Sequence, residues 1–486
     1  MKTIKTDVLV AGGGTAGFVA AIAAARNGAK VLLVETEDYL GGTLSGGMVT
    51  GLNGLRLQRI AGPEGLATFP LQESSYADEQ FTFGLAQEFV DRLIEAKSAW
   101  GSSGKATVRV MFDPEMAKWV IDQMVQEAGV EVLFNTSVVG TYKEGNAVKG
   151  AYIQNSAGKV QVESGVIIDA TADGWVALSA GASYELGRPG DNRCQAISLY
   201  YLLANVNMDA TLDYISKNSQ EYGEYGEDYA NQNQKLKREG KPLSLLPFRS
   251  KMREAMKNGD YPIPYGAENF NPDKQFMVVR PIHRNGRIRY DVTTHNQDMV
   301  YGVNPTDPWE LSRALVGARD VAVRMAAFHR KYVPGFEDCY LSQTAQKIGI
   351  REGNRIIGDY VLTAEDIFSG QTFDDAVGRS GKAVDIHDAD SAKKGIHLQQ
   401  TGGKKGWFHV PYRIIQAKGL ENLLVVGRCT SSDQVANGAV RSQAVSMLTG
   451  QAAGTAAALA VKRSISPRQL PVAELQKVLA SQGVLI

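Results

Sequence analysis

Cysteine is scarce in this chain: its 486 residues include three, Cys194, Cys339 and Cys429. They lie far apart and show no C-x-x-C spacing, which excludes a disulfide framework, a cysteine-based zinc site and a dithiol redox centre. We therefore expect no metal site, and a reducing compartment such as the cytoplasm.

Net charge is absent too, because 52 lysines and arginines balance 52 aspartates and glutamates. No overall field draws the chain to nucleic acid or to anionic lipid. No window reaches the roughly 18 apolar residues that a membrane span needs, and the N-terminus shows no signal-peptide pattern. The sequence predicts a soluble protein with a small ligand, without nucleic acid or a membrane span.

A glycine-rich turn stands near the N-terminus. Residues 7–11 are an apolar run typical of a buried strand, and residues 15–27 are alanine-rich, as in a helix packed on a sheet. In a dinucleotide fold Gly12 permits the tight turn, Gly14 lets the backbone approach a pyrophosphate, and Gly17 lets the helix lie close to the strand. We expect phosphates at the positive end of this helix.

A second strand, residues 30–34, ends in Glu35, about 20 residues beyond the glycines. A carboxylate there accepts hydrogen bonds from ribose hydroxyls and disfavours a 2′-phosphate. A second glycine-rich segment, residues 40–47, favours a longer ligand than NAD, because glycines let backbone amides approach it. Two more apolar segments, 166–174 and 422–428, are typical of buried strands and end in small residues. We expect both to return the chain to the edge of the same sheet at which the ligand binds.

With these motifs the sequence resembles the FAD-dependent oxidoreductases with the glutathione-reductase-type FAD fold, most of all the fumarate reductase and tricarballylate dehydrogenase-like flavoproteins. The matching pieces are GGGTAG with Glu35, LGGTLSGG, IIDATADG, ENLLVVGRC and RSQAVSMLTGQAAGTAAALA. Ala172 departs from the family, whose motif has glycine at this position. The resemblance implies an α/β fold: a Rossmann-like FAD-binding domain, with a central parallel sheet and a β-meander, plus an inserted α+β substrate or cap domain.

The expected domains follow the order of the motifs. Residues 1–185 form the first part of the FAD-binding domain, with 56–110 a partly irregular excursion, and residues 416–486 complete it. Residues 186–415 lack a nucleotide-type glycine pattern and form the cap. No second Rossmann-type turn is present, so we expect no built-in NAD(P)H site.

The resemblance also implies the cofactor contacts. Glu35 binds the adenosine ribose and Val138 flanks the adenine. Apart from the resemblance, the last long helix opens around residues 439–442, and if its N-terminus points at the flavin, its N–H groups and dipole stabilise negative charge on the reduced ring. The first histidine is His283, too late for the family's usual covalent histidine, so we expect non-covalent FAD. The predicted cofactor residues are Gly12, Gly14, Thr15, Ala16, Gly17, Glu35, Thr36, Gly41, Gly42, Thr43, Val138, Ala170, Thr171, Asp173, Gly427, Arg428, Ala439, Val440 and Arg441.

Local signals predict three further elements. Asp113 followed by proline, with Gly129 at the other end, predicts a capped helix, and Asn285-Gly286 between two β-type runs predicts a hairpin. The arginines and histidines of that hairpin are either exposed charge or a cationic wall facing an anionic substrate. The tyrosine-rich stretch at 221–241 is interpreted as a solvated helical face.

The substrate residues are expected on the cap side of the flavin. We interpret 348–367 as containing a helix with Arg351 and Arg355 on one face, where they either clamp a carboxylate or pair with nearby acids. By resemblance, the segments with His387 and with His409 and Arg413 line the reactive face of the flavin. One histidine handles a proton, and Arg351, Arg355 and Arg413 orient the substrate.

The sequence thus predicts an FAD-dependent dehydrogenase or reductase that moves a hydride between a small, anionic or polar substrate and flavin N5. The alternatives are a flavin-dependent monooxygenase or oxidase, and a non-catalytic FAD-containing redox sensor that binds a partner. The electron acceptor or donor is unknown: a quinone, a partner protein, dioxygen or a second small molecule. The sequence leaves open whether the protein forms a homo-oligomer.

Overall fold

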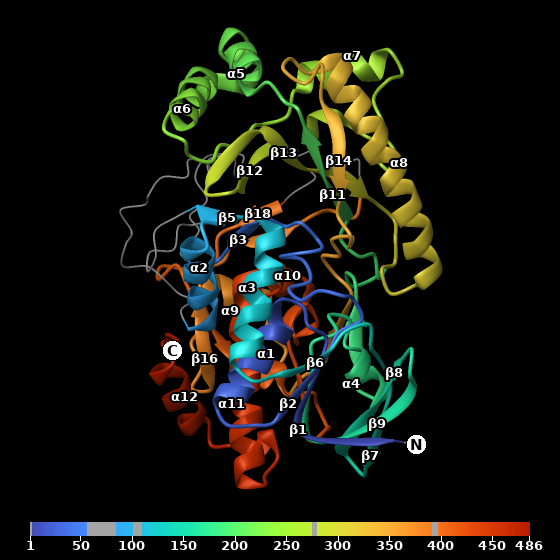
Figure 1. Cartoon of the computed structure of the whole chain (residues 1–486), viewed down its shortest axis with the longest axis vertical. Helices are drawn as coiled ribbons and strands as arrows, with labels where there is room; N and C mark the ends of the chain where they lie inside the picture. Colours follow the sequence, from blue (N-terminus) through green and yellow to red (C-terminus); the bar gives the residue numbers. More distant parts are fainter. Residues whose placement is uncertain (1, 56–83, 101–108, 275–278, 391–396) are drawn as a thin grey trace.

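A parallel sheet forms the centre of the protein. The structure, a computed structural model, describes residues 2–55, 84–100, 109–274, 279–390 and 397–486, so most of the predicted excursion 56–110 lies outside it. The strand order is β6-β2-β1-β9 (Figure 1). β20 pairs with β9 on the far side. All these pairs are parallel, so their carboxyl ends meet at one edge. The strands are β1 (Thr3–Ala11), β2 (Val31–Val34), β6 (Glu131–Leu133), β9 (Gly158–Asp169) and β20 (Leu423–Val425).

The predicted β-meander extends the same sheet. β7 (Ser137–Glu144) and β8 (Ala147–Asn155) pair antiparallel, and β8 pairs with the first half of β9. The second half of β9 pairs with β20 instead. One long strand therefore belongs both to the meander and to the parallel sheet, which confirms the α/β fold with a Rossmann-like core.

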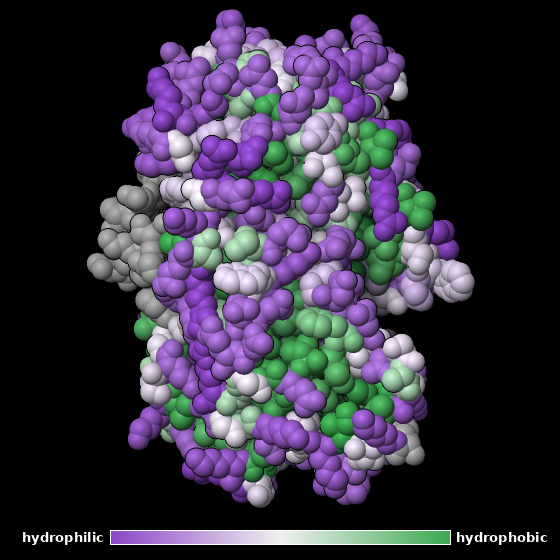
Figure 2. Space-filling model, viewed as in Figure 1, coloured by the Kyte–Doolittle hydropathy of each residue, from purple (hydrophilic) through white to green (hydrophobic). Residues whose placement is uncertain are grey.

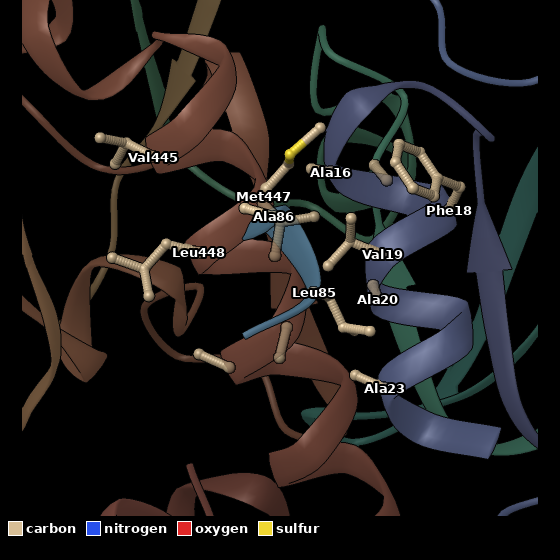
Figure 3. Packing of buried hydrophobic residues seen from close by; sticks show 14 of the residues in the cluster. Ala16, Phe18, Val19, Ala20, Ala23, Leu85, Ala86, Val445, Met447 and Leu448 are labelled. Atoms are coloured by element: carbon tan, nitrogen blue, oxygen red, sulfur yellow. The ribbon is translucent and has the colours of Figure 1, made fainter. Parts of the chain in front are cut away.

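Two alanine-rich helices pack against each other beside the sheet (Figure 3). They are α1 (Thr15–Arg26) and α11 (Gln443–Arg463). A Cβ on Gly450 or Gly454 would collide with the backbone oxygens of Ala16 and Ala20, so glycine permits this close approach. By length and composition α11 could cross a membrane. However, 89% of its most apolar 18-residue stretch is buried inside the protein, as expected of a core helix.

Further helices cover this half of the molecule, and one confirms the capping prediction. Asp113 accepts a hydrogen bond from the Glu115 amide at 3.0 Å, proline follows it, and Gly129 has φ +74° after the last turn. The helices are α2 (Leu85–Glu95), α3 (Pro114–Glu127), α4 (Trp175–Ser179), α9 (Ala364–Ser369), α10 (Gln434–Val440) and α12 (Val472–Ser481).

A second, antiparallel sheet lies above the first in Figure 1, in the order β12-β13-β11-β14. The two-residue link Asn285-Gly286 has positive φ at both positions, 53° and 75°, which confirms the hairpin. The helices at the top, α5 to α7, present a mostly hydrophilic surface (Figure 2). The elements are β11 (Ile197–Ala204), α5 (Met208–Lys217), α6 (Gly226–Arg238), α7 (Arg249–Lys257), β12 (Val279–Arg284), β13 (Arg287–Val300), α8 (Pro308–Tyr332) and β14 (Tyr340–Thr344).

Short strands connect the two halves. β15 pairs with β10, β16 with β19 and β17 with β18, while β3, β5 and β4 form a small sheet. They are β3 (Gly51–Asn53), β4 (Ala99–Trp100), β5 (Arg109–Phe112), β10 (Tyr184–Leu186), β15 (Asn354–Ile356), β16 (Ala376–Ser380), β17 (Val384–Ile386), β18 (His397–Gln399) and β19 (Phe408–Pro411).

Two local predictions are wrong in part. The arginines at 351 and 355 do not share a helix: glycines at 349 and 353 flank Arg351, and Arg355 lies in β15. The tyrosine-rich stretch is not wholly a solvated face, because Tyr222 and Tyr229 pack against the apolar core of the upper half. Their rings bury more apolar area than the polar residues between them could.

Candidate functional site

A cavity of about 420 Å³ opens at the carboxyl edge of the parallel sheet and extends toward the antiparallel sheet. Its size is typical of a site for a small molecule or cofactor. Fifteen of the predicted cofactor residues line it: Gly12, Gly14, Thr15, Ala16, Glu35, Thr36, Gly42, Thr43, Val138, Ala170, Thr171, Asp173, Gly427, Arg428 and Arg441.

The N-terminus of α1 faces one part of this cavity. Gly14 is its N-cap, and no side chain among the described residues caps it, so the first backbone N–H groups remain available to an anion. A Cβ on Gly14 would meet no described atom within 4 Å. The space beside Gly14 therefore fits a pyrophosphate at the point where the helix dipole favours negative charge.

Glu35 lies at the end of β2, where its carboxylate lines the cavity. One oxygen accepts a hydrogen bond from the Gly13 amide at 2.6 Å, and the other accepts from Thr36 Oγ1 at 2.9 Å and from the Glu37 amide at 3.0 Å. These donors hold the carboxylate in place. Its position after the second strand is the one that binds an adenosine ribose in a dinucleotide fold.

The loop after β9 forms the adjoining wall. Arg428 donates to Ala172 O at 3.1 Å, to Ile350 O at 2.9 Å and to Asp173 Oδ1 at 2.5 Å. It thereby ties this loop to a segment of the upper half. Ala172 has φ +70°, a left-handed conformation that disfavours a Cβ. This is a physical reason for the glycine at this position in the flavoproteins that the sequence resembles.

A second uncapped helix N-terminus lies at the other end of the cavity. The last long helix begins at Gln443, not near residue 439 as predicted, because α10 ends at Val440 and the chain breaks its helical path before Ser442. Ser442, Gln443 and Ser446 line the cavity, and Ser442 Oγ is buried with no hydrogen-bond partner among the described residues. This end fits the pyrimidine edge of a flavin, where N–H groups and the helix dipole stabilise negative charge.

Four cations line the same cavity: Arg280, Arg351, Lys382 and Arg441. Arg441 directly precedes Ser442 in the chain. Arg351 donates to Ala196 O at 2.6 Å and to Ser198 Oγ at 3.0 Å. Burial, reinforced by the charge of Arg441, lowers the pKa of Arg351 to about 10.

Arg441 is held by neutral acceptors. It donates to Asp385 O at 2.6 Å and to Gln195 Oε1 at 3.3 Å, while its Nε has no partner among the described residues. Burial lowers its pKa, and the carboxylates of Asp385 and Glu352 partly offset this. Among the described residues no carboxylate lies within ion-pair distance of either Arg351 or Arg441, so this part of the cavity attracts an anion.

His387 lies among these cations. Its Nε2 is 3.3 Å from Asp385 Oδ1, and its backbone N–H donates to Gln195 Oε1 at 3.0 Å. Burial, followed by the charge of Arg351, lowers the pKa of His387 to about 4. The imidazole is therefore neutral at pH 7.

Several predicted residues lie outside the cavity lining. Gly17 and Gly41 pack against the chain itself, and Ala439 and Val440 are buried. Arg355 is 2% exposed and pairs with Glu352 at 2.6 Å.

The remaining two predicted catalytic residues also lie outside the lining. His409 accepts a hydrogen bond from the Phe373 amide at 3.0 Å and stacks on Trp407. Arg413 pairs with Asp375 at 2.9 Å and is 45% exposed. Of the five predicted catalytic residues, the structure brings Arg351 and His387 together at the cavity.

Much of the upper wall of the cavity consists of residues that no sequence motif indicates. Ser198 and Tyr200 come from β11, Arg280 from β12 and Asn296 from β13. Arg280 favours the cationic-wall interpretation of the hairpin, whereas Arg284 and Arg289 pair with Asp113 and Asp291. These strands carry no recognisable motif, and the one available signal was the density of arginine and histidine in the hairpin.

The chain belongs to the FAD dependent oxidoreductase family, whose model matches residues 7–479. FAD is therefore its cofactor, and the Gly14 turn, Glu35 and the two uncapped helix ends fit that group.

Similarity to individual proteins is more limited. Over 42 residues the chain is 55% identical to 4-oxocyclohex-2-ene-1-carboxylate 5-dehydrogenase from Sinomonas cyclohexanicum, an alignment that spans 9% of this chain and 7% of that enzyme. Among solved structures, a geranylgeranyl bacteriochlorophyll reductase-like protein from Thermoplasma acidophilum is 15% identical, with a TM-score of 0.42 over 99% of this chain and 84% of the other. L-proline dehydrogenase from P. horikoshii is 12% identical, with a TM-score of 0.42 over 100% of both chains.

Proposed function

We propose that this FAD-dependent oxidoreductase is a dehydrogenase or reductase, which transfers a hydride between a small anionic substrate and flavin N5. When bound, FAD supplies the two-electron chemistry, and the protein supplies orientation and charge. The proposal includes a non-covalent cofactor and a kinship with the fumarate reductase and tricarballylate dehydrogenase-like flavoproteins. The 42-residue relative carries the name of a dehydrogenase of a carboxylate.

The observation that carries the proposal is the pair Arg351 and Arg441. A buried guanidinium is costly unless a carboxylate or another anion balances its charge. The described residues around the pair offer carbonyl, hydroxyl and amide oxygens. An anionic group of the substrate supplies the missing charge and accepts charge-assisted hydrogen bonds from Arg351.

His387 is the proposed proton carrier. It lines the same cavity as the arginines, and the Asp385 carboxylate lies 3.3 Å from its Nε2. Electrons then pass to or from a quinone, a partner protein, dioxygen or a second small molecule. A built-in NAD(P)H site is not expected, because the sequence shows no second Rossmann-type turn.

Anaerobic titration of the purified protein tests the proposal. Small carboxylates are expected to bleach the flavin absorbance, whereas uncharged alcohols and amines of similar size are not. Arg351→Met should raise the concentration for half-bleaching by about 10- to 100-fold, because a charge-assisted hydrogen bond contributes about 1.5–3 kcal/mol. Arg319→Met, an exposed arginine on α8, is the matched control. A flavin that no anionic compound reduces, or oxygen-dependent hydroxylation of the substrate, would contradict the proposal.

A further inference from the structure

The two ring nitrogens of His387 have different surroundings. Nε2 lies 3.3 Å from the Asp385 carboxylate, whereas Nδ1 is buried with no hydrogen-bond partner among the described residues. A carboxylate beside Nε2 favours the tautomer with its proton there. Nδ1 then presents a lone pair, on a ring that is 5% exposed and held at its backbone by Gln195.

The charges around the ring keep it in this form. Arg351 and Arg441 disfavour a protonated imidazole, and Asp385 favours one. Burial opposes ionisation of Asp385, yet His387, Lys382 and Arg441 together hold the pKa of this carboxyl well below its usual range. The pair is thus a carboxylate beside a neutral imidazole, which is equipped to accept a proton and not to donate one.

We propose that this site oxidises the hydroxyl-bearing carbon of a 2-hydroxy carboxylate, with Nδ1 of His387 as the base, an inference that rests on the function proposed above. The carboxylate binds Arg351 and Arg441. The hydroxyl proton passes to Nδ1, the hydride on the same carbon passes to N5 of oxidised FAD, and the C–O single bond becomes a carbonyl. The substrate loses two electrons and two hydrogens and leaves as a 2-oxo carboxylate.

The surroundings favour a hydroxyl group over an amine or a saturated carbon. Three neighbouring cations, Arg351, Lys382 and Arg441, disfavour a substrate ammonium through like-charge repulsion. A weakly basic imidazole cannot remove the carbon-bound proton next to an unactivated carboxylate. It can accept a hydroxyl proton, since that proton becomes strongly acidic as the hydride leaves.

Anaerobic stopped-flow of the FAD-loaded full chain with three matched compound classes tests the inference. We expect 2-hydroxy acids such as lactate and malate to reduce the flavin and to yield 2-oxo acids. Reduction by alanine or aspartate, or by succinate with an alkene as product, would overturn the inference and leave the proposed function standing. If none of these anionic compounds reduces the flavin, the proposed function fails as well.

His387→Gln separates the base from the binding site. The rate of flavin reduction should fall about 10²- to 10⁴-fold, the usual contribution of general base catalysis. The Kd of oxalate, a non-oxidisable analogue measured through the visible spectrum of bound FAD, should change less than about 3-fold, because the arginines remain. Free imidazole should restore part of the rate to His387→Ala. An unchanged rate, or a loss that imidazole does not restore, would overturn the assignment.

Discussion

The lower and upper halves of the molecule recognise their ligands by different means. The lower half presents backbone amides, small residues and the ends of two helices, and the glycine turn before the first of these helices is a local pattern of a few consecutive residues. The upper half contributes Ser198, Tyr200, Arg280 and Asn296 from three strands. Each segment of the cofactor cavity is therefore recognisable from its own local sequence, whereas the proposed substrate site depends on contacts between distant segments.

Substitutions at Gly17 and Gly14 have the largest expected effect on this contrast. Gly17→Val should abolish folding of the lower half, because a Cβ would collide with Gly12 O and approach Ala170 Cβ at 3.1 Å. Gly14→Val should fold, since its Cβ enters open space, but should lose FAD. Circular dichroism and the visible spectrum of each purified variant distinguish the two outcomes. A Gly17→Val protein with normal FAD content would contradict the local account of cofactor binding.

Arg355 and Arg351 extend the comparison to the upper half. Arg355→Met should lower the free energy of unfolding by about 3–5 kcal/mol, because it leaves the buried Glu352 without its cation. Arg351→Met should change it by less than about 1–2 kcal/mol, because the hydrogen bonds lost at Ala196 O and Ser198 Oγ are offset by the removal of a buried charge without a carboxylate partner. It should act mainly on substrate affinity. Urea unfolding of both variants measures the difference. Equal losses of stability would mean that Arg351 is structural as well.

Acid should weaken the fold through buried histidines. Burial lowers the pKa of His329, on α8, to about 4, with a hydrogen bond to Met325 O opposing the shift. Its folded pKa lies below its unfolded value near 6.5, so the unfolded state binds more protons between about pH 6.5 and pH 4. This histidine lowers stability by up to about 3 kcal/mol across that window. His329→Gln should flatten the pH dependence of the melting temperature, and an unchanged slope would contradict the prediction.

The smallest expected effect is at Ala172. Ala172→Gly relieves a left-handed conformation that costs about 1–2 kcal/mol but adds freedom to the unfolded chain, which costs about 0.5–1 kcal/mol. The variant should therefore be more stable by up to about 1 kcal/mol, with FAD affinity unchanged within a few-fold. Thermal unfolding and fluorescence titration with FAD check both values. A clear loss of stability would show that the alanine methyl group packs favourably against the loop.

The lower half is more predictable from the sequence than the upper half. Glycine turns, caps and the Asn285-Gly286 link act over a few residues, so the chain itself displays them. The arginines at 351 and 355 have helical spacing, yet pairing of β15 with β10 determined the local structure. Gln195 acquires its hydrogen bond with the His387 amide through a contact between segments 192 residues apart in the chain, which spacing does not reveal.

The packing of α11 on α1 bears on the order in which the protein is made. β1 and α1 are synthesised before β20 and α11, which complete their surroundings. At about 5–20 residues per second, the ribosome needs roughly 20–80 s between α1 and β20. During that time the apolar face of α1 lacks its final partner, so the nascent chain depends on chaperones or transient contacts until α11 emerges.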